Sequence, residues 1–161
     1  MTWRRTTSGD GAFSSLFRDD SVEDVESWWF LPYDQLNLAF FEGKESYGII
    51  LIESEEQGKR RPYHKQKLSF LLSNLRHFAL EAQSDNVPVL HFTTTAQYDK
   101  ALNGILQEIG TINMFKPAER ELRMTLKPLI DEGRINLHEH PGWLTPQEWF
   151  TSTVGTEPVS Y

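Results

Sequence analysis

The segment YHKQKLSFLLSNLRHFALEAQ (residues 63–83) decides the fold of this chain. Between Leu68 and Ala82 its apolar residues recur at the i, i+3, i+4, i+7 spacing of one helical face, which predicts a helix over 64–83. That apolar face must pack against another element of the fold to be buried. The run YGIILIE (47–53) before it is β-branched and apolar on both faces, as in a central strand of a parallel sheet. The two segments together predict a helix packed on a sheet.

The same alternation of apolar runs and amphipathic stretches continues along the chain. Further strands are expected at 27–31, 87–92, 111–116 and 134–140, and further helices at 97–109, at 118–132 and from Thr145 onward. Pro128 should kink or restart the helix over 118–132, because proline lacks the amide donor. Gly110 and Gly133 stand where helices end. This rhythm predicts an α/β fold, a three-layer αβα sandwich with about five parallel strands, Rossmann-like or flavodoxin-like.

A single domain accounts for the 161 residues. Residues 1–25 are polar with few apolar positions, and we expect a flexible N-terminal arm there, with a short helical turn around 14–17. The α/β domain is expected over 26–155, followed by a short tail over 156–161.

Composition narrows the classes of function. The chain contains no cysteine, which excludes thiol catalysis and a cysteine-ligated zinc or iron–sulfur cluster within these residues. Its net charge of −7 repels nucleic acid, so no direct DNA binding is expected. No apolar run approaches the roughly 18 residues that span a bilayer, and we expect the first residues not to be a secretory signal, because no apolar stretch follows their arginines. We therefore expect a cytoplasmic protein without a membrane partner.

The standard phosphate-binding loops are missing. Neither a G-x-G-x-x-G pattern after the first strand nor a G-x-x-x-x-G-K-[ST] pattern occurs, and PYDQL (32–36) stands where a dinucleotide fold would place its glycines. This argues against ordinary NAD binding and P-loop NTP hydrolysis. No Ser/His/Asp set can be proposed from spacing either, so no catalytic residue is assigned.

Polar side chains follow the first two predicted strands at their carboxyl ends, where parallel sheets bind ligands. Asp34 and Gln35 come after the first strand and Glu53 ends the second. A carboxylate beside an amide can read the edge of a heteroaromatic ring. The alternative is that Asp34 caps a turn, Gln35 is solvated and Glu53 caps the next loop.

Two further groups of residues are candidates for binding. The loop 54–63 is long for such a connection, contains Arg60 and leads into His64, so it can bind phosphate at a helix N-terminus or be a solvated loop. His138 and His140 stand two apart on a predicted strand and share a face, but nothing else has ligand spacing, and we expect no metal.

The chain is rich in aromatic residues, with five Trp, five Tyr and ten Phe. The tryptophans and one phenylalanine, namely Trp28, Trp29, Trp143, Trp149 and Phe150, can line a stacking pocket for a flat ligand or belong to the core.

The stretch YHKQKLSFLLSNLRHFA (63–79) resembles the HKQKhhhhhsAMRHFAeeL helix of the deoxyribodipyrimidine photolyase-related family, the iron–sulfur bacterial cryptochromes and photolyases. Asp34-Gln35-Leu36 is similar to the family's G-D-Q-L, and Glu53 falls at its strand-ending glutamate. Downstream, 117–119 sits like the family's E-P-G-E, and WLTPQEWF (143–150) is similar to its F-L-x-x-x-x-F-x-x-W tail. The resemblance covers residues 27–150.

The resemblance implies a Rossmann-like domain with an antenna-chromophore site for 6,7-dimethyl-8-ribityllumazine or a flavin. By the same resemblance, the ligand-binding residues are Tyr33, Asp34, Gln35, Glu53, Arg60 and His64. In the family a larger helical domain carries FAD, the iron–sulfur cluster and the DNA lesion. We expect that domain to be absent from this chain, and a separately encoded one to be a possible partner in DNA repair.

Several positions at the ligand edge differ from the family. Tyr33 replaces a glycine, Arg60 replaces a tyrosine, and Arg120 and Glu121 replace a tryptophan and an arginine. Three hypotheses stay open. The chain is a stand-alone domain that binds a flat heteroaromatic ligand or serves a photolyase or cryptochrome as accessory, or a non-catalytic protein-interaction module that has lost the ligand. The third is another kind of enzyme on the same scaffold.

Overall fold

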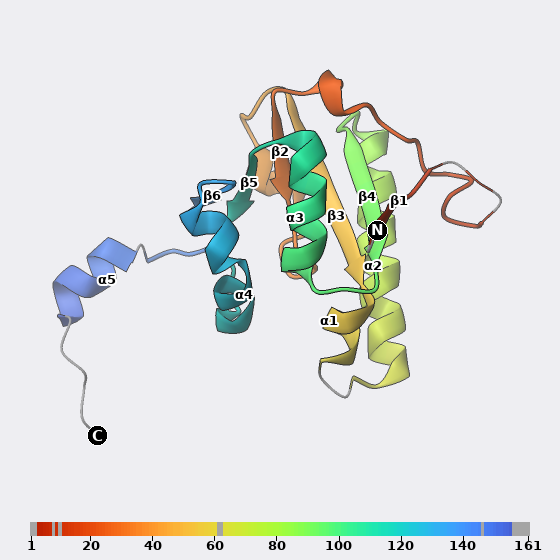
Figure 1. Ribbon diagram of the computed structural model, residues 1–161. Coiled ribbons are helices and arrows are strands. Elements are labelled where there is room, and N and C mark those ends of the chain that lie inside the picture. Colours follow the sequence, from red (N-terminus) through yellow and green to blue (C-terminus); the bar gives the residue numbers. More distant parts are fainter. Residues whose placement is uncertain (1–2, 8, 10, 61–62, 146, 156–161) are drawn as a thin grey trace.

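The computed structural model describes residues 3–7, 9, 11–60, 63–145 and 147–155, so the expected tail over 156–161 lies outside the described residues. Within them the chain forms one six-stranded sheet in the order β1-β4-β3-β2-β5-β6 (Figure 1). The strands are β1 (Trp3–Arg5), β2 (Ser27–Phe30), β3 (Tyr47–Ser54), β4 (Val89–Thr94), β5 (Ile112–Phe115) and β6 (Ile135–His138).

Strands β2 to β6 are parallel, as the alternating sequence predicts. The chain runs outward from β2 through β3 to β4, then crosses back to add β5 and β6 on the other side of β2. This order is Rossmann-like and differs from the flavodoxin-like one. The strand order reverses between β2 and β5, which marks the place where such sheets bind ligands.

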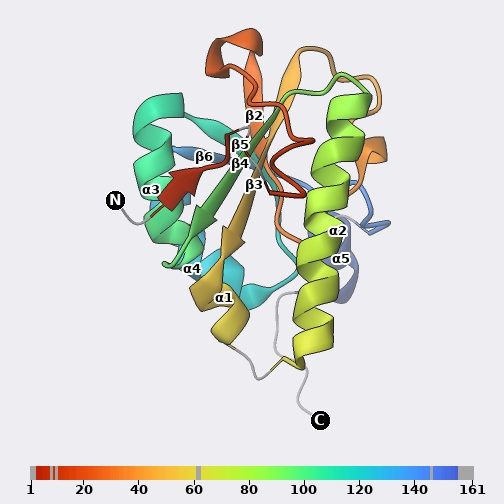
Figure 2. The same cartoon turned by 90° about the vertical axis from the view of Figure 1, so that its right-hand side faces the viewer.

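Helices cover both faces of the sheet, giving three layers (Figure 2). On one face α2 (Lys65–Ser84) packs through Leu75, Phe78 and Ala79. The opposite face is covered by α3 (Tyr98–Ile109) and α4 (Arg120–Asp131). The β-branched residues of β3 alternate between the two cores, which explains why this strand is apolar on both sides.

Three local expectations can be compared with the structure. The segment over 54–63 is not simply a long loop, because Ser54 caps a short helix, α1 (Glu55–Lys59), by accepting a hydrogen bond from the amide of Gln57. Helix α4 contains Pro128 and continues to Asp131, so the proline does not restart it. Gly110 has a φ of 84° at the end of α3, the left-handed region that glycine favours.

The N-terminal segment is packed onto the domain over its described residues, which differs from the loose arm expected for 1–25. Strand β1 pairs antiparallel with β4, a sixth strand that the sequence did not predict. Phe17 is 2% exposed in the core beside α2. The carboxylate of Asp20 accepts hydrogen bonds from the amide of Val89, at 2.9 Å, and from the side chain of Gln83, at 2.7 Å. Hydrogen bonds of a polar side chain therefore hold the N-terminal segment on the domain, although its composition resembles that of a solvated arm.

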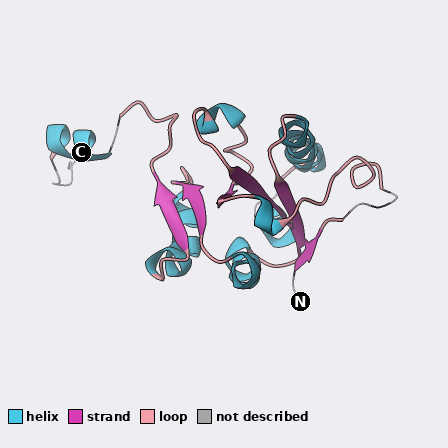
Figure 3. Ribbon diagram, turned by 90° about the horizontal axis from the view of Figure 1, so that it is seen from above, coloured by secondary structure: helices cyan, strands magenta, loops and turns pink. Residues whose placement is uncertain are grey.

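The C-terminal helix α5 (Gln147–Val154) stands apart from the sheet and the other helices in two views (Figures 1 and 3). Its large apolar side chains are exposed, among them Trp149 and Phe150. In the described part of the chain, no helix is long and apolar enough to cross a membrane.

Candidate functional site

The side chain of Gln35 links the loop after β2 to the end of β5, where the strand order reverses. Its side chain is buried, and its Nε2 donates to the carbonyl oxygens of Phe115 and Lys116, each at 3.3 Å. The loop after β2 is thereby tied to the end of β5. The sequence placed Gln35 correctly at the carboxyl edge of the sheet, but its amide donors serve the backbone of the sheet itself.

Tyr33 and Glu53 line one small cavity of about 50 Å³ over the end of β3, together with Tyr63 and Tyr98. This volume is well below the roughly 300 Å³ at which small-molecule sites begin, so this cavity as it stands does not hold a lumazine or flavin ring. Burial, followed by the neighbouring Tyr63 and Glu119, raises the pKa of Tyr33 to about 12. The side chain of Tyr33 forms part of the wall of this cavity.

Both carboxylate oxygens of Glu53 are engaged within the protein. Arg76 of α2 donates to Oε1 at 2.6 Å and to Oε2 at 2.8 Å, and Nε2 of His91 lies 3.1 Å from Oε1. Burial alone would raise the pKa of Glu53, but the hydrogen bonds with Arg76 and His91 outweigh it and lower the pKa to about 2. Glu53 is therefore an ionised partner of α2 and β4.

Sequence reasoning missed this cluster of Arg76 and His91 around Glu53. Two signals were present, since Arg76 belongs to the RHFA part of the helix motif and His91 interrupts an apolar strand. Thr6 completes a row of hydroxyl, imidazole and carboxylate, with its Oγ1 2.7 Å from Nδ1 of His91. Such a row occurs in acyl-transfer enzymes.

The surroundings of this row indicate a structural role. His91 is 1% exposed, and the rings of Phe13 and Phe17 meet its imidazole edge-on at 5.0 and 5.9 Å. Its carboxylate member, Glu53, is also bound by Arg76. We interpret the row as the anchor of the N-terminal segment on the sheet.

The remaining predicted residues do not join Tyr33 and Glu53. Asp34 is exposed; partial removal from water raises its pKa, while its own backbone amide and His140 oppose that rise. Arg60 pairs with Glu121 of α4 at 3.6 Å. Nδ1 of His64 accepts a hydrogen bond from the amide two residues on and caps α2.

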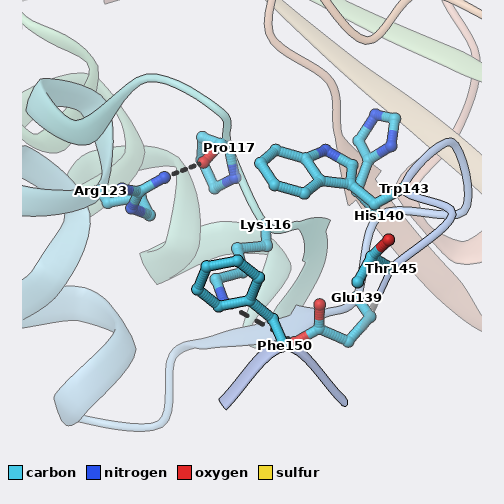
Figure 4. Close-up of a pocket in the computed structure, with 8 residues that line it drawn as sticks. All are labelled: Lys116, Pro117, Arg123, Glu139, His140, Trp143, Thr145 and Phe150. Carbon is cyan, nitrogen blue, oxygen red and sulfur yellow. Dashed lines mark hydrogen bonds and ion pairs between the residues drawn. The ribbon is translucent and has the colours of Figure 1, made fainter. Parts of the chain in front are cut away.

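A larger cavity of about 380 Å³ opens at the carboxyl ends of β5 and β6, a volume within the usual range for small-molecule sites. Figure 4 shows its lining residues, which are Lys116, Pro117, Arg123, Glu139, His140, Trp143, Thr145 and Phe150. We call this cavity the Trp143 pocket. A cavity of similar volume, which Glu53 also lines, lies over the ends of β3 and β4, but its described lining includes no aromatic side chain.

Hydrogen bonds to and from the backbone position the walls of the Trp143 pocket. Nη1 of Arg123 donates to the carbonyl oxygens of Pro117, at 2.7 Å, and Ala118, at 3.0 Å, which fixes the guanidinium across the turn before α4. His140 accepts from the amide of Gly142 through Nδ1 and packs edge-on against the ring of Phe40 at 4.8 Å. The pocket wall next to the sheet is thus ordered by its own chain.

The opposite wall consists of exposed aromatic side chains. Trp143 is 59% exposed and Phe150 53% exposed, so much of their ring surface meets solvent. Lys116 and Arg123 contribute two cations and Glu139 one carboxylate. Flat rings combined with cations can stack an aromatic compound and bind a negative group.

The two histidines considered for metal binding are separated by the end of β6. His138 ends the strand, with its ring 4.7 Å from that of Trp29 and its Nε2 2.9 Å from Oδ1 of Asn113. His140 lies in the loop beyond. In the described residues no group of three or more potential ligands is placed to bind a metal ion.

A comparison with protein-family models matches residues 30–159 to the deoxyribodipyrimidine photo-lyase-related protein family. The chain belongs to this photolyase-related family. No curated protein matches it. The family match confirms the resemblance based on residues 63–79, and it includes both edge regions where Tyr33 and Trp143 lie.

Proposed function

We propose that this photolyase-related domain binds a flat heteroaromatic compound of the lumazine or flavin kind, and that the compound occupies the Trp143 pocket. The supporting observation is a cavity of about 380 Å³ beside two rings, Trp143 and Phe150, that are each more than half exposed. Stacking of a flat ring on such side chains contributes on the order of 1 kcal/mol beyond the area that it buries.

The proposal moves the ligand away from the residues that the family resemblance suggests. Tyr33 occupies space at the smaller cavity, and Glu53 is paired with Arg76. The Trp143 pocket lies at the same carboxyl edge of the sheet, on the side of β5 and β6. An antenna or accessory role toward a photolyase-type helical domain is compatible with this place, and no residue is assigned a catalytic role.

Titration of the purified domain with 6,7-dimethyl-8-ribityllumazine and with riboflavin tests the proposal through absorbance and fluorescence. Trp143→Ala should weaken binding about tenfold, because it removes a stacking face. Trp149→Ala is the matched control, since Trp149 is 60% exposed on α5 and does not line the pocket. Failure of both compounds to bind would refute the proposal, as would equal losses in the two variants.

A second candidate function is a protein-interaction module. It is favoured by the exposed apolar side chains on 143–154, including Leu144 at 98% and Val154 at 51%. Large apolar side chains left in solvent are typical of interaction sites. If a separately encoded photolyase-type helical domain is the partner, Leu144→Ser and Trp149→Ser should abolish a complex of defined native mass while ligand titration stays unchanged.

A further inference from the structure

A further cavity, of about 330 Å³, lies beside the start of α4. In its described lining it shares no residue with the Trp143 pocket, so the two are separate places. We call it the Arg120 cavity. Its described lining consists of the residue that follows α1 and four residues of α4, namely Arg60, Arg120, Glu121, Met124 and Thr125.

The Arg120 cavity joins two parts of the chain that leave the sheet on opposite sides of β2. Helix α1 follows β3 and α4 follows β5, and both helices lie at the same end of the sheet (Figures 1 and 2). Nη2 of Arg60 lies 3.6 Å from Oε2 of Glu121, so the two parts approach closely there. Because β2 lies between β3 and β5, the cavity is at the reversal of strand order, where such sheets bind ligands.

Positive charge predominates in the lining of this cavity. Arg60 and Arg120 contribute two cations against the one carboxylate of Glu121, whereas the chain as a whole has a net charge of −7. A local excess of positive charge on an acidic protein favours a ligand that carries negative charge.

Both guanidinium groups keep donors for such a ligand. Arg60 meets Glu121 through Nη2, and a guanidinium carries five N–H donors in all. Arg120 is an exposed residue, and its side chain forms no hydrogen bond or ion pair with the part of the chain that the structure describes. Two arginine side chains are thus able to bind one anion from two sides.

The presence of two guanidinium groups favours a phosphate over a carboxylate. A carboxylate is matched by one guanidinium, as in this protein, where Arg76 binds both carboxylate oxygens of Glu53. A phosphate monoester has three free oxygens and up to two negative charges, so it can accept from two guanidinium groups at once. Met124, which is 58% exposed, offers an apolar surface in the same cavity for the organic part of an ester.

We infer that the Arg120 cavity binds a phosphate group, free or on a small phosphorylated molecule, between the guanidinium groups of Arg60 and Arg120. The carboxylate of Glu121 competes with this group for Arg60 and limits its affinity. This second site does not depend on whether the Trp143 pocket binds a ring.

Butyl phosphate, inorganic phosphate and butanoate are suitable probes, because none of them has an aromatic ring that could stack on Trp143. Isothermal titration calorimetry of the 161-residue chain at low ionic strength and about pH 8 measures their affinities, since a phosphate monoester is a dianion there. We expect butyl phosphate to bind with a dissociation constant of about 1 mM or less, and butanoate about tenfold more weakly.

The comparison of the two phosphates distinguishes the sources of the group. Tighter binding of butyl phosphate would support a phosphorylated molecule, and equal or tighter binding of inorganic phosphate would support free phosphate. Absence of saturation by either one at about 10 mM would overturn the site, because a site of about 1 mM affinity would then be about nine-tenths filled. Butanoate that binds as tightly as butyl phosphate would overturn the preference for phosphate.

Variants locate the effect. Arg60→Gln and Arg120→Gln should each weaken the binding of the tighter phosphate probe about tenfold, as the loss of a charge-assisted hydrogen bond predicts. Arg4→Gln is the matched control, because Arg4 is exposed on β1 and does not line the cavity. Unchanged thermal midpoints show that the variants are folded.

Three results would overturn the assignment of the site. An equal loss in Arg4→Gln would mean that charge acts from the whole surface, and a loss at only one of Arg60 and Arg120 would mean that the two do not share the anion. A loss in Trp143→Ala would place the anion in the Trp143 pocket instead. Phosphate binding that persists in Trp143→Ala while flavin binding is lost would support two separate sites.

Discussion

Arg76 binds both carboxylate oxygens of Glu53, at 2.6 and 2.8 Å, and so joins the middle of α2 to the end of β3. The two residues come from different parts of the family's sequence pattern, one from the helix motif and one from the strand-ending glutamate. Their contact gives one structural reason for the presence of both parts in the pattern. It also means that a residue assigned to the ligand by resemblance is occupied by an internal partner.

Glu53→Gln should destabilise the domain by about 1–2 kcal/mol, because the amide cannot accept both bonds from Arg76 and leaves His91 without its anionic partner. Urea denaturation measures the change. Glu55→Gln is the control, since Glu55 pairs with Lys59 on an exposed surface and should matter by no more than about 0.5 kcal/mol. Equal effects at the two positions would contradict the structural role of Glu53.

The same variant also tests where the ligand lies. If the Trp143 pocket is the binding site, Glu53→Gln leaves riboflavin and lumazine titrations unchanged. Loss of binding without loss of stability would return the ligand to Glu53.

Stability should fall in acid through Glu53. Its pKa is about 2 in the folded protein against an ordinary value of 4.5, so its contribution is present above 4.5 and is lost as the pH drops from 4.5 toward 2. The difference in unfolding free energy between the wild-type protein and Glu53→Gln should therefore be smaller near about pH 3 than near about pH 6. Chemical denaturation at both values checks the sign, and a difference that grows in acid would contradict it.

Phe17→Ala should destabilise the domain by about 3 kcal/mol, because Phe17 is 2% exposed against α2. Leu16→Ala provides a neighbouring control, since Leu16 is 70% exposed and should matter little. Thermal unfolding followed by circular dichroism compares them. Equal midpoints would mean that the N-terminal segment does not belong to the core.

The effect of Gly104→Ala on the stability of the domain should change sign when Trp3 is removed. A Cβ at Gly104 of α3 would lie 2.3 Å from Nε1 of Trp3, so the substitution should destabilise the wild-type protein. In a Trp3→Ala background the same change should stabilise by about 0.5–1 kcal/mol, because alanine favours a helix over glycine. Denaturation of the four proteins completes the double-mutant cycle. A change in stability of the same sign in both backgrounds would refute the packing of Trp3 against Gly104.

Local patterns predicted most of the fold. The helix expected over 64–83 occupies Lys65–Ser84 and the strand expected over 47–53 occupies Tyr47–Ser54, since periodicity and β-branching act within a segment. Strand β1 was not predicted, because three residues are too few to show a periodicity. Its partner strand β4, in which Thr94 lies opposite Trp3, is also far along the chain. The packing of Phe17 depends likewise on distant contacts.

The candidate site was less accessible to sequence reasoning. Alternation placed Gln35 and Glu53 at the correct edge of the sheet. The residues that they contact could not be predicted from local sequence patterns. The acceptor carbonyl of Phe115 is 80 residues from Gln35. Trp143 and Phe150 could equally have been core residues, but in the structure both are more than half exposed and line the Trp143 pocket.

Among the described strands, β2 and β5 share the shortest register in the sheet. Strands β3 and β4 are paired along Ile49–Ser54, whereas the described register between β2 and β5 consists of Trp29 with Asn113. We expect the half that contains β5, β6 and α4 to open as a cooperative unit of lower stability, with faster amide hydrogen exchange in Ile112–Phe115 than in Tyr47–Ser54. Because the Trp143 pocket belongs to that half, a bound ligand should slow its exchange first, and the domain would report occupancy through the dynamics of one side of its sheet.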